Sequence, residues 1–243
     1  MGAAVNRQAQ SAVLFLLGAA LLHAGATDLY LRYVKAGLRP LLLAAGAVLI
    51  VTALATAWYE RRHAARNHEE GRHAHPEPRV SWLLVLPLLA LILVAPPALG
   101  SYSATRTGTA LQEPLAYPPL SAADPLPLSV VDYAGRAVYD HGRTLVGRTV
   151  RLTGFVALDR AGTPYLVRMA LNCCAADAQP VKVGLTGRIP PVLQPDTWLA
   201  VTGVYTPRTV HDPVNGGPIP YLEVTDARPV PAPRDPYDES WNN

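Results

Sequence analysis

Three long runs without Asp, Glu, Lys or Arg constrain this chain more than any other feature of its sequence. Two of them, residues 8–27 and 40–59, are 20 residues long, and residues 80–105 continue without charge for 26 residues. At a rise of about 1.5 Å per residue, about 20 apolar residues in a helix cross a bilayer core roughly 30 Å thick. We therefore expect three transmembrane helices, at about residues 8–27, 40–59 and 81–100, in a membrane region formed by residues 1–100. A cleaved secretory signal is the alternative for the first run.

Basic residues near these runs predict the orientation in a cell membrane. With the N-terminus inside, six Lys and Arg lie on the cytoplasmic side, namely Arg7 and five arginines of the loop at residues 60–79. Four lie on the outer side: Arg32, Lys35, Arg39 and Arg106. Because basic residues are enriched in cytoplasmic loops, we expect a cytoplasmic N-terminus and an extracytoplasmic C-terminal half. The lipid bilayer is accordingly one expected partner.

The loop at residues 60–79 holds four of the seven histidines of the chain. They are His63, His68, His73 and His75, and Glu69, Glu70 and Glu77 lie among them. Imidazole and carboxylate groups bind zinc, so these histidines are candidate metal ligands. Their spacing of five, five and two residues fits no helical ligand pair, because a helix brings together residues three or four apart. A solvated basic loop is the alternative interpretation.

Proline and a change of period mark the second half of the chain. Residues 101–128 contain five prolines and neither apolar period, which predicts a semi-rigid extended linker. Residues 129–140 can form a short amphipathic helix, and five short alternating stretches follow from about residue 150. We expect a small all-β domain at residues 129–235, an OB-like five-stranded barrel, with a tail at residues 236–243. A β-sandwich is the alternative. The expected fold class is therefore mixed, with three N-terminal transmembrane α-helices and a C-terminal all-β domain.

The charge of the second half excludes one class of partner. Residues 129–243 carry eleven Lys and Arg and eleven Asp and Glu. Binding to a phosphate backbone requires clustered basic charge, which a balanced composition does not favour. We therefore expect no nucleic-acid partner.

Both cysteines of the chain stand side by side at Cys173 and Cys174, in a stretch that continues to Asp177. In an extended strand their side chains point to opposite faces, so a turn must intervene before both can reach one metal ion. Adjacent Cα atoms lie about 3.8 Å apart, below the usual range for a disulfide. Three interpretations stay open: a buried thiol at a strand end, metal ligation by Cys174 with Asp177 or a histidine, and a redox-active thiol.

Several stretches together resemble the YcgQ family. They are the three apolar runs, the His-containing loop, the proline-rich segment, Leu145–Phe155 (L-V-G-R-T-V-R-L-T-G-F), Cys174–Asp177 (C-A-A-D) and the ending Asp235-Pro236-Tyr237. Members of that family are described as subunits of a two-component membrane permease. The resemblance implies that the family cysteine falls on Cys174 and its acid on Asp177, with Cys173 a common neighbour. It also implies a multi-span permease subunit as partner. The loop departs from members that have dense runs of His, Asp and Cys there.

From the residues and the resemblance together, we expect an integral membrane accessory subunit of a permease complex. It presents an extracytoplasmic OB-like binding domain and is linked to the handling of a divalent metal, with zinc as the metal. No catalytic constellation stands out, so we do not expect an enzyme. The alternatives are a membrane-anchored metal-binding protein and a thiol or redox protein that uses Cys174.

Overall fold

The computed structural model describes residues 7–66, 83, 85–94 and 96–239. The contacts of the chain divide it into two compact units, Met1–Tyr30 with Ala36–Pro97, and Leu31–Lys35 with Ala98–Asn243. The second unit takes in Leu31–Lys35, a piece of the connector between the first two apolar runs.

Two long apolar helices form from the first two uncharged runs. They are α1 (Arg7–Ala26) and α2 (Arg39–Arg66), and the connector between them contains two 3-10 turns, Asp28–Arg32 and Ala36–Leu38. Within this stretch, Gln8–Ala26 and Ala36–Arg62 are long and apolar enough to cross a membrane. Two of the three expected helices are therefore present.

The third expected span is not confirmed as a transmembrane helix. In place of a helix over residues 81–100, the described residues form α3 (Val85–Leu93), which is 9 residues long. Such a helix rises roughly 14 Å, about half of a bilayer core. Pro96 and Pro97 follow soon after its end, and proline disfavours helical continuation because it lacks an N–H and restricts the residue before it.

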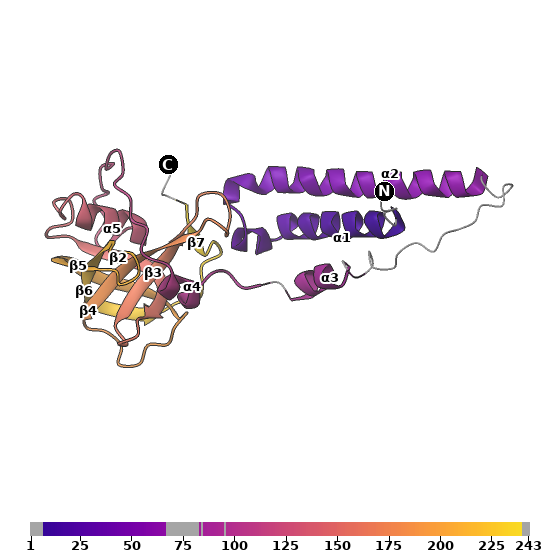
Figure 1. The fold of residues 1–243 in the computed structure, drawn as a ribbon. Coiled ribbons are helices and arrows are strands. Elements are labelled where there is room, and N and C mark those ends of the chain that lie inside the picture. Colours follow the sequence, from indigo (N-terminus) through magenta and orange to yellow (C-terminus); the bar gives the residue numbers. More distant parts are fainter. Residues whose placement is uncertain (1–6, 67–82, 84, 95, 240–243) are drawn as a thin grey trace. The chain divides into compact units, whose positions relative to one another are not determined.

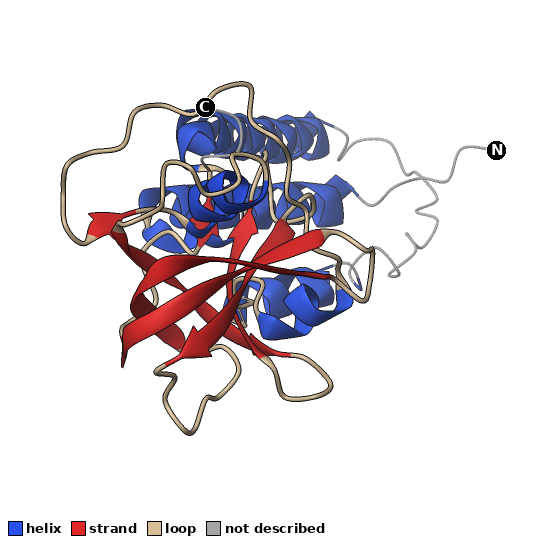
Figure 2. Ribbon diagram, turned by 90° about the vertical axis from the view of Figure 1, so that its left-hand side faces the viewer, coloured by secondary structure: helices blue, strands red, loops and turns tan. Residues whose placement is uncertain are grey.

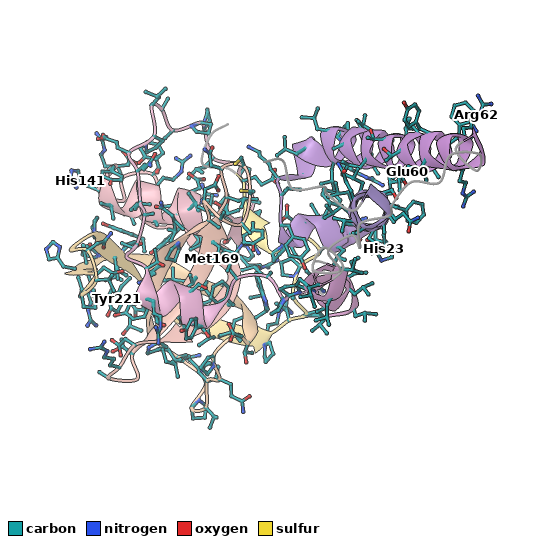
Figure 3. All side chains as sticks on the ribbon, turned by 45° about the vertical axis from the view of Figure 1, so that its right-hand side comes forward. His23, Glu60, Arg62, His141, Met169 and Tyr221 are labelled. Atoms are coloured by element: carbon teal, nitrogen blue, oxygen red, sulfur yellow. The ribbon has the colours of Figure 1, made fainter. Side chains whose placement is uncertain are left out.

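Glycines allow α1 and α2 to approach closely. A Cβ on Gly18 would lie 2.9 Å from the carbonyl oxygen of Gly46, so only glycine fits at this crossing. Small residues at helix contacts are typical of membrane helices, where backbones pack directly. Away from this contact, α2 exposes a series of large apolar side chains: Leu41, Val48, Val51, Leu54 and Trp58. Glu60 and Arg62 follow near the C-terminal end of α2 (Figure 3), where Arg62 stacks 3.7 Å from the centre of the Trp58 ring.

A closed barrel of five strands forms the body of the second unit (Figure 1). The strands are β2 (Thr149–Leu158), β3 (Pro164–Ala170), β4 (Gln179–Gly187), β5 (Trp198–His211) and β6 (Pro218–Pro229). Their order around the barrel is β2–β5–β6–β4–β3, and β3 closes the ring by pairing with β2. All pairs are antiparallel except β4 with β6. The expected closed barrel is therefore confirmed, and a sandwich of two separate sheets is excluded.

Glycine bends the strands where the barrel closes. The first half of β2 pairs with β5, and from Phe155 onward β2 pairs with β3. A Cβ on Gly154 would lie 2.7 Å from the carbonyl oxygen of Val167, so this bend needs glycine. Gly203 lies at a register shift between β5 and β6. An isolated glycine within a strand is typical of such a bend or close backbone approach.

A short helix, α5 (Val130–Val138), covers one end of the barrel and contacts all five strands (Figure 2). It begins at Ser129, whose side chain accepts a hydrogen bond from the N–H of Asp132 and so caps the helix. Tyr133 is fully buried, and its hydroxyl donates to the carbonyl oxygen of Tyr221 at 2.7 Å. The interior is filled by buried aliphatic side chains, among them Leu152, Val156, Leu166, Val183 and Leu222. The helix expected over residues 129–140 is therefore present.

The proline-rich segment differs from the expected free linker, because it packs along the barrel. It contains α4 (Ser101–Arg106) and β1 (Leu126–Pro127), which pairs in parallel with β2. Arg136 donates to the carbonyl oxygen of Pro118 at 2.8 Å, and the hydroxyl of Tyr139 donates to that of Leu111 at 3.0 Å. Backbone groups make most of these contacts, so the segment shows no apolar period that a sequence could reveal.

The end of the chain also joins the barrel. β7 (Tyr237–Asp238) pairs in parallel with β3, and Arg168 donates to the carbonyl oxygen of Tyr237 at 2.7 Å. Part of the expected tail at residues 236–243 is therefore ordered on the barrel.

Candidate metal centre

The loop between β3 and β4 brings the two cysteines to one place. The backbone bends at Asn172 and Cys173 and then turns through Ala175 to Asp177. The N–H of Asp177 donates to the carbonyl oxygen of Cys174 at 3.0 Å, which closes this turn. The strand alternation therefore ends before the cysteines, and the turn that both thiols need to reach one ion is present.

The carboxylate of Asp177 holds the loop in this shape. One of its oxygens accepts the N–H of Asn172 at 3.1 Å, and the other accepts those of Cys173 at 2.9 Å and Cys174 at 3.4 Å. Three successive backbone donors thus point at one side chain. An aspartate that bonds the backbone of its own turn is a common way to fix such a loop.

The thiols of Cys173 and Cys174 and a carboxylate oxygen of Asp177 all lie within 4.8 Å of one another. On a tetrahedral zinc ion, sulfur and oxygen ligands lie about 3.6–3.8 Å apart, given bond lengths of about 2.1–2.3 Å. The three ligand atoms are therefore close enough together to be candidates for ligands of one ion. Both thiols are free, with Cys173 exposed and Cys174 half-buried, so an ion can reach them from solvent.

Asp177 sets the protonation of Cys173. The hydrogen bond between the Asp177 carboxylate and the Cys173 thiol is the largest cause that raises the pKa of Cys173, to about 11. A hydrogen bond between the side chains of Cys173 and Cys174 is the next largest. Partial burial by itself would raise the pKa of Asp177, but hydrogen bonds from the Cys173 side chain and from the three backbone N–H groups hold it below its usual value. Cys173 is therefore a protonated thiol beside a carboxylate at neutral pH, which disfavours a nucleophilic or redox role for it.

A second segment, far away in the sequence, lies against this loop. Val34 forms an antiparallel bridge with Cys174. The N–H of Lys35 donates to the carbonyl oxygen of Cys173 at 3.0 Å, and the N–H of Ala175 donates to that of Tyr33 at 2.7 Å. In the sequence, this connector was assigned only to the outer side of the membrane, through Arg32, Lys35 and Arg39. Three alternating residues are too short a signal to identify a strand.

Four histidines were also predicted from the sequence as metal ligands. His63 lies in α2, and nothing is described of its side chain. His68, His73 and His75 lie outside the described residues. Within the described ranges, Cys173, Cys174 and Asp177 form the group of three candidate ligands. Cys173, expected only as a neighbour, thus joins the predicted pair of Cys174 and Asp177.

The outer face of β3 is covered by the chain itself. Met169, on β3 (Figure 3), belongs to a second apolar cluster that lies outside the barrel interior. Its other buried members include Phe155, Val167, Ile219 and Ala104 of α4. OB-type barrels commonly bind oligonucleotides and oligosaccharides across this side of the barrel. In this chain α4 and β7 occupy part of it.

The comparisons with known proteins identify the domain but not an activity. Residues 129–238 match the family described as the DUF1980 C-terminal domain. No curated protein and no solved structure matches the chain. The matched range begins just before α5, ends at β7, and includes the whole barrel with its cysteine loop. A DUF1980 C-terminal domain is therefore found at residues 129–238 of this chain.

Proposed function

We propose that this chain is a membrane-anchored accessory subunit that binds zinc on its barrel domain and works with a multi-span permease. The observation that carries this proposal is the cluster of Cys173, Cys174 and Asp177, whose three ligand atoms lie within 4.8 Å of one another. The chain itself performs no catalytic step in this proposal.

The ligand set favours zinc and a site that can exchange its ion. Two thiols select soft or borderline ions, and a carboxylate alongside them suits zinc. Three protein ligands leave one position of a tetrahedral ion open, as in zinc sites that bind an external ligand. The exposure of Cys173 gives such a ligand access. The site is thus suited to receiving an ion and passing it on.

Membrane anchoring is supported by α1 and α2. Both are long and apolar enough to span a bilayer, and the large apolar side chains exposed along α2 are those that lipid or a partner helix covers. Exposing these apolar side chains to water would be unfavourable by about 25 cal/mol for each Å² of apolar area.

The placement of Leu31–Lys35 supports a barrel on the same side of the membrane as the connector between α1 and α2, because this connector belongs to the same compact unit as the barrel. The basic residues favour the outer side for both. If α2 spans the membrane, the chain must cross back between Arg66 and Ala98 to reach the barrel. We therefore propose three crossings, a cytoplasmic N-terminus and an extracytoplasmic barrel.

The permease partner is supported by the family resemblance and fits the DUF1980 domain at residues 129–238. Co-purification in a mild detergent tests it. We expect the tagged chain to bring with it a membrane protein of about eight or more spans. Repeated recovery of the chain alone, after crosslinking in intact membranes as well, would count against a stable partner.

Zinc titration of the full-length protein in detergent tests the metal site. We expect one strongly bound ion per chain, and loss of that ion when Cys173 and Cys174 are both changed to serine or when Asp177→Asn is made. Asp159→Asn is a matched control, because Asp159 also accepts two backbone N–H bonds in a turn, from Ala161 and Thr163 at 2.8 Å each.

A second variant separates the cluster from the histidine loop. Changing His63, His68, His73 and His75 to alanine should leave the strongly bound ion in place. Equal zinc binding by the wild-type protein and the double serine variant would show that the cluster is not the site.

A further inference from the structure

The residues that would bind zinc also hold the connector between α1 and α2. We propose that zinc binding at Cys173, Cys174 and Asp177 is thermodynamically linked to the pairing of this loop with Tyr33–Lys35. The bound ion then stabilises the backbone hydrogen bonds between the loop and the connector. This inference rests on the proposed zinc site and adds a way for its occupancy to reach the membrane helices.

The linkage follows from shared residues. Cys173 offers its thiol to the ion and its carbonyl oxygen to the N–H of Lys35, at 3.0 Å. Cys174 offers its thiol and pairs with Val34. An ion that joins Cys173, Cys174 and Asp177 restricts the backbone torsions between them. The carbonyl of Cys173 and the N–H of Ala175 then stay in the orientation that pairs with the connector.

Few residues separate the paired segment of the connector from α2. Leu31–Lys35 is flanked on both sides by residues of the helical unit, Tyr30 and Ala36. Only Ala36, Gly37 and Leu38 separate Lys35 from Arg39, the first residue of α2. A conformational restraint on Tyr33–Lys35 is therefore transmitted along the backbone, through a few residues, to the start of α2.

A second contact supports the same arrangement. The hydroxyl of Tyr237 donates to the carbonyl oxygen of Arg32 at 3.1 Å and accepts the N–H of Leu99 at 3.2 Å. Tyr237 is itself buried. One phenol thus ties the connector to the point where the chain enters the barrel unit after α3. The connector is held at two places, the cysteine loop and Tyr237.

Linkage is reciprocal, so weakening the connector contact must weaken zinc binding. Lys35→Pro removes the N–H that donates to the carbonyl oxygen of Cys173 and leaves the three ligand side chains unchanged. Lys35→Ala is its matched control, because it keeps the N–H and removes only the side chain. Tyr237→Phe removes the second contact, because it deletes the hydroxyl oxygen and changes nothing else in the side chain. For the full-length protein in detergent, we expect Lys35→Pro to weaken zinc affinity about fivefold or more and Lys35→Ala to leave it nearly unchanged.

Hydrogen exchange provides a second measurement. In the wild-type protein, zinc should slow exchange of the N–H groups of Lys35 and Ala175. In Tyr237→Phe, this protection should be smaller. Wild-type protein that binds no zinc would overturn the proposed function itself. Wild-type protein that binds zinc, with Lys35→Pro and Tyr237→Phe binding as tightly and with exchange at Lys35 unchanged by zinc, would overturn the linkage alone.

Discussion

At the scale of single residues, Asp177 determines the character of the cysteine loop. Its carboxylate accepts the N–H groups of Asn172, Cys173 and Cys174 and raises the pKa of the Cys173 thiol to about 11 through their hydrogen bond. One side chain therefore both shapes the loop and keeps Cys173 protonated at neutral pH. This combination protects the thiol from oxidation while leaving it close to a second thiol.

The Asp177→Asn substitution should make Cys173 more reactive in the metal-free protein. Loss of the carboxylate removes the main cause of the raised pKa, so more thiolate is present at neutral pH. Alkylation of Cys173 by iodoacetamide at pH 7.5, followed by mass spectrometry, should accelerate about tenfold or more. An unchanged or slower rate would show that Asp177 does not control this thiol.

Asp159 predicts an acid dependence of the stability of the barrel. Burial alone would raise its pKa, but hydrogen bonds from Thr163 and from the N–H of Ala161 hold the pKa below its usual value. A carboxylate with a lowered folded pKa stabilises the fold above the unfolded value of about 3.9 and loses that effect as pH falls through the folded pKa.

Thermal unfolding followed between about pH 5 and pH 3 measures this effect. The wild-type midpoint should fall more steeply with acid than that of Asp159→Asn, whose side chain does not titrate. At neutral pH the variant should lose about 1 kcal/mol or less, because asparagine keeps an acceptor oxygen. Parallel curves for the two proteins would rule out a contribution from this carboxylate.

At the scale of elements, the segment from Ala98 to Leu128 belongs to the barrel instead of serving as a spacer. It is bound by a buried ion pair of the barrel, formed by Lys182 of β4 and Asp212 at 2.6 Å. Lys182 also donates to the carbonyl oxygen of Thr107 at 2.9 Å, and Asp212 accepts the N–H of Thr109 at the same distance. The pair thus holds the chain after α4 against the barrel.

The Asp212→Asn substitution should be strongly destabilising, because it leaves the Lys182 ammonium buried without its counter-charge. Removing one partner of a buried pair typically costs about 3–5 kcal/mol. The free energy of unfolding in a double-mutant cycle with Lys182→Met measures the coupling, and the double variant should recover part of the loss. A loss below about 1 kcal/mol for Asp212→Asn would mean that this pair does not hold the segment.

These elements also show what the sequence could reveal. The uncharged runs predicted α1 and α2 because a bilayer sets helix length regardless of neighbouring residues. The five short alternating stretches from about residue 150 predicted a five-stranded barrel. The packing of residues 98–128 and the pairing of Val34 with Cys174 rest on irregular backbone contacts between distant segments. No period in the sequence records such contacts. The turn at Asp177 was considered, but its three N–H bonds could not be counted from the residue alone.

At the scale of the whole molecule, the chain consists of an apolar helical unit and a barrel unit. Leu31–Lys35 belongs to the barrel unit, although Tyr30 and Ala36 on either side of it belong to the helical unit. A DUF1980 C-terminal domain covers the barrel. In our proposal the helices anchor the domain, the cysteine loop binds zinc, and the connector joins the two roles. The unit boundaries within the connector are the structural reason for proposing that barrel and connector face the same side of the membrane.

Protease treatment of intact cells stripped of their wall tests this orientation. A tag at the C-terminus should be removed while the membrane is intact, and a tag at the N-terminus should survive until the membrane is permeabilised. The reverse result would place the barrel in the cytoplasm and contradict the proposed topology.

X-ray absorption at the zinc edge tests whether Cys173 and Cys174 bind zinc, because it identifies the ligand atoms of the ion bound to the full-length protein. We expect two sulfur ligands at about 2.3 Å with oxygen or nitrogen ligands at about 2.0–2.2 Å. We also expect loss of the sulfur shell when both cysteines are changed to serine. A strongly bound zinc surrounded only by nitrogen and oxygen in the wild-type protein would contradict the proposed site, since the ion would then be bound away from Cys173 and Cys174.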